Sequence, residues 1–268
     1  MAHSLWRKVM NYNPKNAAWQ NRDRFVLSNG HACALQYCML HLTGYDLPIT
    51  ELQNFRQLGS LTPGHPTNFV TNGIEVSAGP IGQGICNAVG FAMAEAHLDH
   101  FTYVICGDRC LQEVVTDASS LAGHLGLGKL ILLYDDNNIT IDRSNDISFT
   151  EDVMKRYEAY GWDASQVVEG NDDLAGIQAA AKLVTDKPSI ISVKTIIGVG
   201  STKAGTHGVY GASLGDVDLA HVKSHFRLDP EKKFHVDEDV YAAKVIRHIP
   251  VFPMKRIPVV VLLVIIGT

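Results

Sequence analysis

The chain has 268 residues, 46% of them hydrophobic and 19% charged, which suits one large α/β domain with a sizeable core. A net charge of −5 without a Lys/Arg cluster gives no reason to expect a nucleic-acid partner. The five cysteines form neither a metal knuckle nor a disulfide framework, so we expect reduced thiols in a cytoplasmic protein.

Neither end of the chain carries a pattern that we interpret as a secretion or membrane signal. Residues 1–5 are too few for a signal peptide and lack its charged-then-apolar order. The apolar run at residues 259–266 is far shorter than the roughly 20 residues that a spanning helix needs. We therefore expect no membrane partner.

Segments with strand and helix patterns alternate along the chain. Strands are predicted at residues 23–27, 103–106, 130–134, 166–169 and 189–197. Helices are predicted at residues 2–9, 32–42, 49–58, 85–98, 149–160, 172–184 and 216–226, with a further amphipathic helix pattern between the second and third strands. This alternation predicts an α/β fold with a doubly wound parallel sheet flanked by helices. We assign residues 1–240 to this domain and leave 241–268 as an unassigned tail.

Three loops carry residues that suit a phosphate or another polar ligand. His31 follows Gly30 where a strand leads into a helix, and His65 lies in a loop stiffened by two prolines. The glycine-rich loop 79–84 precedes a helix, where glycine permits close backbone approach and the helix start favours anions. Each pattern also has an ordinary structural interpretation: a histidine cap, a solvated histidine and a common turn.

Oxygen-bearing side chains directly follow two predicted strands. Asp108 comes after the strand 103–106, and Asn137 comes after the strand 130–134. Ligands gather at the carboxyl ends of parallel strands, and an aspartate, an asparagine and a nearby carbonyl suit Mg²⁺ or Ca²⁺ holding a phosphate. The alternative is that Asp and Asn simply form turns and helix caps.

The chain resembles transketolase in several long motifs that occur in the family's order: DRFVLSNGHA, FRQLGSLTPGHP, GPIGQGICNAVG, SLAGHLGLGKLILLYDDNNITID and FTEDVMKRYEAYGW. Gly107-Asp108 followed by Asn137-Asn138 is similar to the family's thiamine diphosphate (ThDP) fingerprint, and the resemblance runs from about Ala2 to Val240. It implies the ThDP-binding fold and a transferase of the pentose phosphate pathway. Such an enzyme moves a two-carbon ketol unit between sugar phosphates, using ThDP and Mg²⁺ (or Ca²⁺).

The resemblance also implies roles for individual residues. By this carry-over the metal ligands are Asp108, Asn137 and the carbonyl of Ile139. The catalytic histidines are His31 and His65. The cofactor-binding residues are His31, Gly79, Ile81, Gly107, Asp108, Arg109, Glu113, Asn137, Ile197 and Tyr210.

Three positions depart from the family pattern. Arg109 and Val114 stand where the family has glycine, and Tyr210 stands where it has histidine. The Arg109 guanidinium can neutralise phosphate charge, or its bulk can close the space and remove a backbone angle that glycine permits. We expect impairment, because Val114 replaces a second glycine close by.

The resemblance further implies that the chain is truncated at both ends relative to the family. An upstream segment with a Ser-Gly-His-Pro motif and a second, pyrimidine-binding domain are not recognised, so we expect half an active site and a partner chain in a homo- or hetero-oligomer such as a dimer. One alternative is a degenerate, non-catalytic domain that acts as a binding partner. Another is a dihydroxyacetone or deoxyxylulose phosphate synthase, which LTPGHP, GPIGQG and YDDNNITID disfavour.

Overall fold

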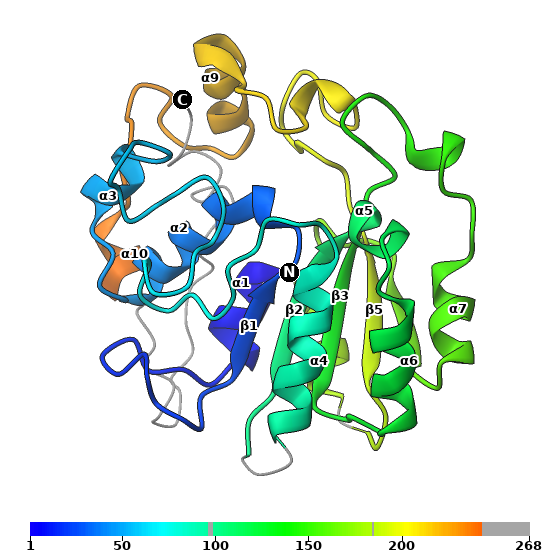
Figure 1. Ribbon diagram of the computed structural model, residues 1–268. Helices are drawn as coiled ribbons and strands as arrows, with labels where there is room; N and C mark the ends of the chain where they lie inside the picture. The colour runs from blue at the N-terminus through cyan, green and yellow to red at the C-terminus, as the bar shows by residue number, and fades with distance from the viewer. Residues whose placement is uncertain (96–98, 184, 243–268) are drawn as a thin grey trace.

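The computed structural model describes residues 1–95, 99–183 and 185–242 (Figure 1). Within them a parallel five-stranded sheet has the order β1-β2-β3-β5-β4. The strands are β1 (Arg24–Leu27), β2 (Thr102–Gly107), β3 (Leu130–Asp136), β4 (Asp163–Val167) and β5 (Ser189–Lys194). The prediction of a doubly wound parallel sheet is confirmed.

Helices occupy most of the connections between the strands. The α-helices are α1 (Ala2–Ser4), α2 (Cys33–Thr43), α3 (Ile49–Gln53), α4 (Gln83–Glu95), α5 (Asp108–Gln112), α6 (Thr116–His124), α7 (Val153–Ala159), α8 (Leu174–Lys182), α9 (Gly215–His225) and α10 (Glu238–Ala242). Residues Leu5–Val9 form a π-helix (η1), and short 3₁₀ turns lie at η2 (Gly30–Ala32), η3 (Asn145–Ile147) and η4 (His207–Val209).

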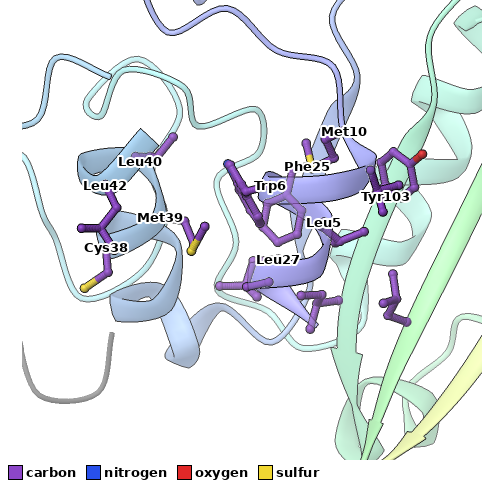
Figure 2. Close-up of a cluster of buried hydrophobic side chains, with 14 of the residues drawn as sticks. Leu5, Trp6, Met10, Phe25, Leu27, Cys38, Met39, Leu40, Leu42 and Tyr103 are labelled. Atoms are coloured by element: carbon purple, nitrogen blue, oxygen red, sulfur yellow. The ribbon is translucent and has the colours of Figure 1, made fainter. Parts of the chain in front are cut away.

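Alternating side chains of the buried strands feed two hydrophobic clusters, one on each face of the sheet. Tyr103 and Ile105 of β2 belong to the first cluster, which also contains residues of η1, α2 and α8. Figure 2 shows Tyr103 together with members from η1, β1 and α2. Val104 and Cys106 belong to the second cluster, which contains residues of α4, α6 and α7. Apolar strands covered on both faces explain why the sheet is parallel and central.

Several element boundaries differ from the predicted ones. Strand β3 continues past Tyr134, because Asp135 and Asp136 still pair with Val193 and Lys194 of β5. Strand β4 begins three residues before the predicted position, where Asp163 pairs with Ser189.

The predicted helices also shorten or divide. Helix α7 begins only at residue 153, because the Asp152 carboxylate accepts the Lys155 N–H at 3.1 Å as an N-cap. The helix predicted after β2 divides into α5 and α6 around residues 113–115.

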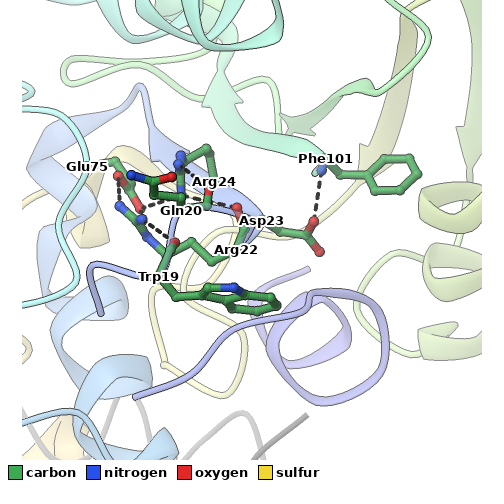
Figure 3. A network of polar contacts seen from close by, with 7 residues as sticks. All are labelled: Trp19, Gln20, Arg22, Asp23, Arg24, Glu75 and Phe101. Atoms are coloured by element: carbon green, nitrogen blue, oxygen red, sulfur yellow. Dashed lines mark hydrogen bonds and ion pairs between the residues drawn. The ribbon is translucent and has the colours of Figure 1, made fainter. Parts of the chain in front are cut away.

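A polar network secures the amino ends of β1 and β2 (Figure 3). Arg22 makes two bonds of 2.8 Å to the Glu75 carboxylate. Asp23 accepts the backbone N–H of Phe101 at 2.8 Å and that of Asn11 at 2.6 Å. These contacts fix the end of the sheet opposite to the Asp108 end, where the predicted ligand residues lie.

The predicted tail lies almost wholly outside the described residues, which end at Ala242 in α10. In the described part of the chain, no helix combines the length and apolarity that crossing a membrane requires.

Candidate functional site

Asp108 and Asn137 follow neighbouring strands at the same edge of the sheet. Gly107 of β2 pairs with Asp135 of β3, so α5 starts beside the turn that follows β3. The structure therefore brings together the two strand ends that carry oxygen ligands in the sequence.

Asp108 is buried, with 3% of its surface exposed, and accepts a short hydrogen bond from the Tyr134 hydroxyl. Burial raises the pKa of Asp108 to about 6, and the charges of Asp136 and Asp135 act in the same direction. The Tyr134 hydroxyl and the Asn138 backbone N–H oppose that rise. A cation at this point would favour the carboxylate, since an opposite charge lowers a carboxyl pKa.

The turn after β3 is shaped by its two asparagines. The Asn137 side-chain oxygen accepts the N–H of Ile139 at 3.0 Å, and its NH₂ donates to Asp135 at 3.1 Å. Asn138 adopts a left-handed backbone with φ 60°, which asparagine tolerates better than most residues. The turn thereby holds Asn137 and the Ile139 backbone beside the start of α5.

Two further aspartates near this turn already have partners. Asp135 accepts the Thr195 hydroxyl at 2.5 Å, and burial raises its pKa. Asp136 accepts the Ser192 hydroxyl at 2.9 Å and pairs with Lys194 at 2.6 Å. Both therefore connect β3 to β5 and the segment after it.

The glycine-rich loop packs tightly against its neighbours except at one position. A side chain at Gly84 would meet Ser28 Cα at 2.6 Å, and one at Gly82 would meet Glu113 Cβ at 2.8 Å. At Gly79, apart from its two chain neighbours, no atom of the described residues lies within 4 Å of the place a Cβ would take, so the backbone there borders open space. Ile81, which lies between Gly79 and Gly82 in the sequence, is half-buried and packs against the second hydrophobic cluster.

His31 and Tyr210, 179 residues apart in sequence, lie in contact. The Tyr210 hydroxyl is 3.2 Å from His31 Nε2, and the two rings stack with centroids 5.3 Å apart. Surrounding atoms desolvate the His31 ring although part of it stays exposed, and this lowers its pKa below 6.5. The charges of His65, Arg109 and Arg56 lower it further, so the ring is neutral at pH 7.

The loop that carries His65 is anchored to α2. The Tyr37 hydroxyl lies 2.9 Å from the Pro63 carbonyl oxygen and 3.0 Å from that of His65. The Cys33 thiol donates to the Gly64 carbonyl at 3.1 Å. These bonds hold the backbone and leave the His65 side chain exposed on the His31 side of the domain.

Arg109 and Val114 cause no backbone strain. Neither has the positive φ that would require glycine, and Arg109 lies within α5. Val114 is 86% exposed, so its side chain displaces nothing in the core. The structure thus shows no strain at either position, and the expected impairment of cofactor binding by Arg109 stays a prediction.

The remaining predicted positions lie around this edge. Glu113 is exposed just after α5, and Gly107 precedes it at the end of β2. Ile197 lies beyond β5, where its carbonyl accepts the Gly205 N–H at 2.8 Å and closes a loop.

Sequence analysis did not single out Asn29, Tyr134 or Arg56. The buried side-chain oxygen of Asn29 has no hydrogen-bond partner among the residues that the structure describes, and its amide lies near Gly107. Asn29 lies within the SNGH motif, and its place in that motif is the one feature of the sequence that could have pointed to it. Tyr134 had no signal, because an apolar run does not show where a hydroxyl will point. Arg56 adopts a left-handed backbone with φ 62°, which its sequence does not indicate.

The residues at this edge suit a metal-bound diphosphate. In the described ranges no group of three or more His, Cys, Asp or Glu side chains is arranged to hold a metal ion. A metal at Asp108 would thus need amide and carbonyl oxygens, which Asn137 and Ile139 offer and which hard cations accept. The open space at Gly79 and the unpartnered Asn29 oxygen show that the edge also has room and polar capacity for a ligand.

Comparison with known proteins identifies the family. Residues 1–249 match the family model described as transketolase, thiamine diphosphate binding domain. The chain belongs to the transketolase family. Transketolase 1 of Saccharomyces cerevisiae is 57% identical over 256 residues, which are 90% of this chain and 37% of that protein. Transketolase from a Nostoc species is 55% identical over 258 residues, which are 90% of this chain and 38% of the relative.

Solved transketolases share the fold. The structure from Leishmania mexicana superposes with a TM-score of 0.88 at 51% identity, over 90% of this chain and 38% of that one. A Pichia stipitis transketolase in complex with sedoheptulose-7-phosphate gives a TM-score of 0.88 at 50% identity, over 91% of this chain and 38% of that one. The chain thus spans little more than a third of the relatives it matches.

Proposed function

We propose that this chain supplies the diphosphate-binding half of a transketolase site. In this proposal Asp108, Asn137 and the Ile139 carbonyl hold a divalent metal, Mg²⁺ or Ca²⁺. Gly79, Ile81, Gly107, Glu113 and Ile197 line the ThDP cofactor. The observation that carries the proposal is the meeting of buried Asp108 with the Asn137–Ile139 turn at adjacent strand ends.

When bound, ThDP supplies the carbanion chemistry and the electron sink that ketol transfer requires. The chain's own residues would position the reactants. His31 is held by Tyr210 with a neutral ring, which can donate or accept a proton at a sugar hydroxyl. His65, on an anchored loop, presents an exposed imidazole for the same sugar phosphate.

Activity further requires a complementary pyrimidine-binding domain, which we propose comes from another chain in a homo- or hetero-oligomer such as a dimer. The support is the exposed apolar side chain of Val114, two residues after the end of α5, which suits a contact with another protein surface. Sedimentation of the chain alone and mixed with the complementary part of a relative tests this, and a mixture that sediments as separate species would contradict it.

We also propose a place in the cytoplasm and in the pentose phosphate pathway. None of the five cysteines, all of which lie in the described residues, forms a disulfide, as a reducing compartment favours. A relative from Zea mays is named chloroplastic, so cell fractionation is the relevant test. Recovery of the protein in an organelle fraction would contradict the cytoplasmic assignment.

The alternative function is a non-catalytic domain that pairs with an intact homologue. Arg109 and Tyr210 favour it, because both alter the diphosphate-facing edge. Cofactor binding without ketol transfer in the assembled complex would support this alternative.

Calorimetric titration of the whole chain with ThDP in the presence of Mg²⁺ tests the proposal. We expect saturable binding that Asp108→Ala strongly weakens, because the substitution removes the proposed anionic metal ligand. Glu158→Ala, which removes an exposed carboxylate of α7, should bind as the wild type does. A chain shown by circular dichroism to be folded, yet unable to bind ThDP, would contradict cofactor binding by this chain.

A further inference from the structure

Asp218, in the first turn of α9, is a buried carboxylate outside the set of residues assigned to the site above. Only 6% of its surface is exposed. Its Oδ2 accepts the Ser201 hydroxyl at 2.6 Å, and its Oδ1 accepts the Thr202 backbone N–H at 2.8 Å and the Thr202 hydroxyl at 3.0 Å. All three donors belong to the β5–α9 segment, residues 195–214, which joins the sheet to α9 (Figure 1). Asp218 therefore fixes this segment to the helix that follows it.

The Ser201 hydroxyl connects Asp218 to the rest of the segment. It donates to Asp218 and accepts the Lys203 N–H at 3.0 Å. The Lys203 carbonyl in turn accepts the Thr206 hydroxyl at 2.7 Å. Asp218 is thereby joined through successive hydrogen bonds to Thr206, which lies directly before η4.

Tyr210 directly follows η4, and the same bonds continue to it. The Thr206 hydroxyl accepts a backbone N–H of η4 at 3.3 Å, and the Tyr210 N–H donates to the His207 carbonyl at 2.9 Å. Val209 packs closely on Gly198, where a Cβ would meet Val209 Cγ2 at 2.7 Å. The position of Tyr210 thus depends on the fold of the segment that Asp218 anchors.

We propose that Asp218 is a positioning residue that, through the β5–α9 segment, holds Tyr210 against His31. The contact that it would maintain is the one described above, with the Tyr210 hydroxyl 3.2 Å from His31 Nε2 and the two rings stacked. Removing a hydrogen-bond acceptor leaves buried donors unsatisfied, and Ser201 is such a buried donor. The effect of Asp218 on the contact is independent of any ligand, and its importance for ketol transfer rests on the proposed function.

The test is the pKa of His31, measured in the whole chain by NMR titration of its ring protons. Asp218→Ala should raise this pKa towards 6.5, because Tyr210 moves away and water reaches the ring. Tyr210→Ala gives the size of the full change. The double variant should change the pKa no further than Tyr210→Ala does, because both substitutions act through the same contact.

Two milder variants separate the hydrogen bonds from the fold of α9. Asp218→Asn should restore part of the contact, since an amide oxygen still accepts the Thr202 N–H. Ser201→Ala keeps Asp218 and removes the hydroxyl that connects it to Lys203, so it should raise the His31 pKa as well. It decides the question if Asp218→Ala fails to fold.

Asp216→Ala is the matched control. It removes a carboxylate from the same turn of α9, but this carboxylate is exposed and pairs with Lys233 at 3.1 Å. The substitution should leave the His31 pKa unchanged. Circular dichroism of each variant shows whether the chain has folded.

Three results would overturn the inference: an unchanged His31 pKa in folded Asp218→Ala or Ser201→Ala, additive changes in the double variant, or an equal change in Asp216→Ala. If Asp218 served stability alone, its loss would lower the free energy of unfolding without moving the His31 pKa of the folded chain. Failure of the wild type to bind ThDP with Mg²⁺ is a separate result, which contradicts the proposed function and leaves the His31 titrations readable.

Discussion

Tyr210 places its hydroxyl 3.2 Å from His31 Nε2 at a position where the resembling family has histidine. A tyrosine there carries no positive charge near neutral pH, so the charge at this edge shifts to Arg109 and Arg56. Two of the three departures from the family pattern, Arg109 and Tyr210, thus lie at the same edge of the sheet. Relative to the family pattern, the chain lacks a histidine at position 210 and has an additional arginine at position 109.

This placement predicts a change in the titration of His31. Arg109→Gln should raise the pKa of His31 towards 6.5, because the guanidinium disfavours the imidazolium form. Titration of the His31 ring protons by NMR, assigned with a His31→Gln variant, measures it. Lys15→Gln, which removes an exposed positive charge near the amino ends of the strands, should leave the His31 pKa unchanged. An unchanged pKa in Arg109→Gln would place the guanidinium away from His31.

Sequence analysis identified the candidate residues, but it did not identify which of them lie in contact. Asp108 and Asn137 were predicted from their positions after apolar runs, and the parallel register brings those ends together. The contact between His31 and Tyr210 was not predictable, because the loops joining them have no periodicity. The hydroxyl of Tyr134 was missed for a related reason: β-strand spacing gives the face of a residue and not its hydrogen-bond partner.

Helix α4 holds the glycine-rich loop against the end of β1. Its second residue, Gly84, lies so close to Ser28 that a Cβ would approach Ser28 Cα to 2.6 Å. Gly90, on the same helix, has no other atom within 4 Å of a Cβ. Position 84 therefore has no room for a side chain, whereas position 90 has room for one.

The pair gives a matched prediction for stability. Gly84→Ala should lower the free energy of unfolding by about 1–3 kcal/mol, because overpacking forces the helix and strand apart. Gly90→Ala should raise it by about 0.5–1 kcal/mol, since alanine restricts the unfolded chain and suits a helix interior. Urea denaturation measures both. Equal effects of the two substitutions would contradict the close contact at Gly84.

Element types were predictable and their ends were not. Apolar runs predicted β2, β3 and β5, because strands buried on both faces are continuously apolar. Alternation and β-formers predicted β1, whereas the largely exposed β4 was placed only in part. The end of β3 was misplaced, since Asp135 and Asp136 look like turn residues but pair with β5 and bond to Thr195 and Ser192. Long-range partners of this kind allow polar residues to remain in a strand.

At the scale of the whole molecule, the contacts that stabilise the sheet and the residues proposed to bind a ligand lie at opposite ends of the strands. The amino ends of β1 and β2 are fixed by the bonds of Arg22 and Asp23, whereas the opposite edge holds Asp108 and the Asn137 turn. That edge contains a buried carboxylate with a raised pKa and, among the described residues, an arginine, Arg109, that forms no ion pair. Burial of either charge is costly, and a metal or a phosphate group would offset that cost.

A metal at Asp108 that also holds the diphosphate predicts a particular dependence on metal. Mg²⁺ and ThDP should each strengthen the binding of the other by the same factor, because coupling between sites is reciprocal. The coupling should depend on Asp108, because its carboxylate is the proposed anionic metal ligand.

The most direct measurement is the affinity of the chain for ThDP with and without saturating Mg²⁺, in the wild type and in Asp108→Asn. The account predicts that Mg²⁺ tightens ThDP binding by roughly 10-fold or more in the wild type. In Asp108→Asn that factor should fall close to one while the metal-free binding persists. An Mg²⁺ effect that is the same in both proteins would place the metal elsewhere and contradict the site described here.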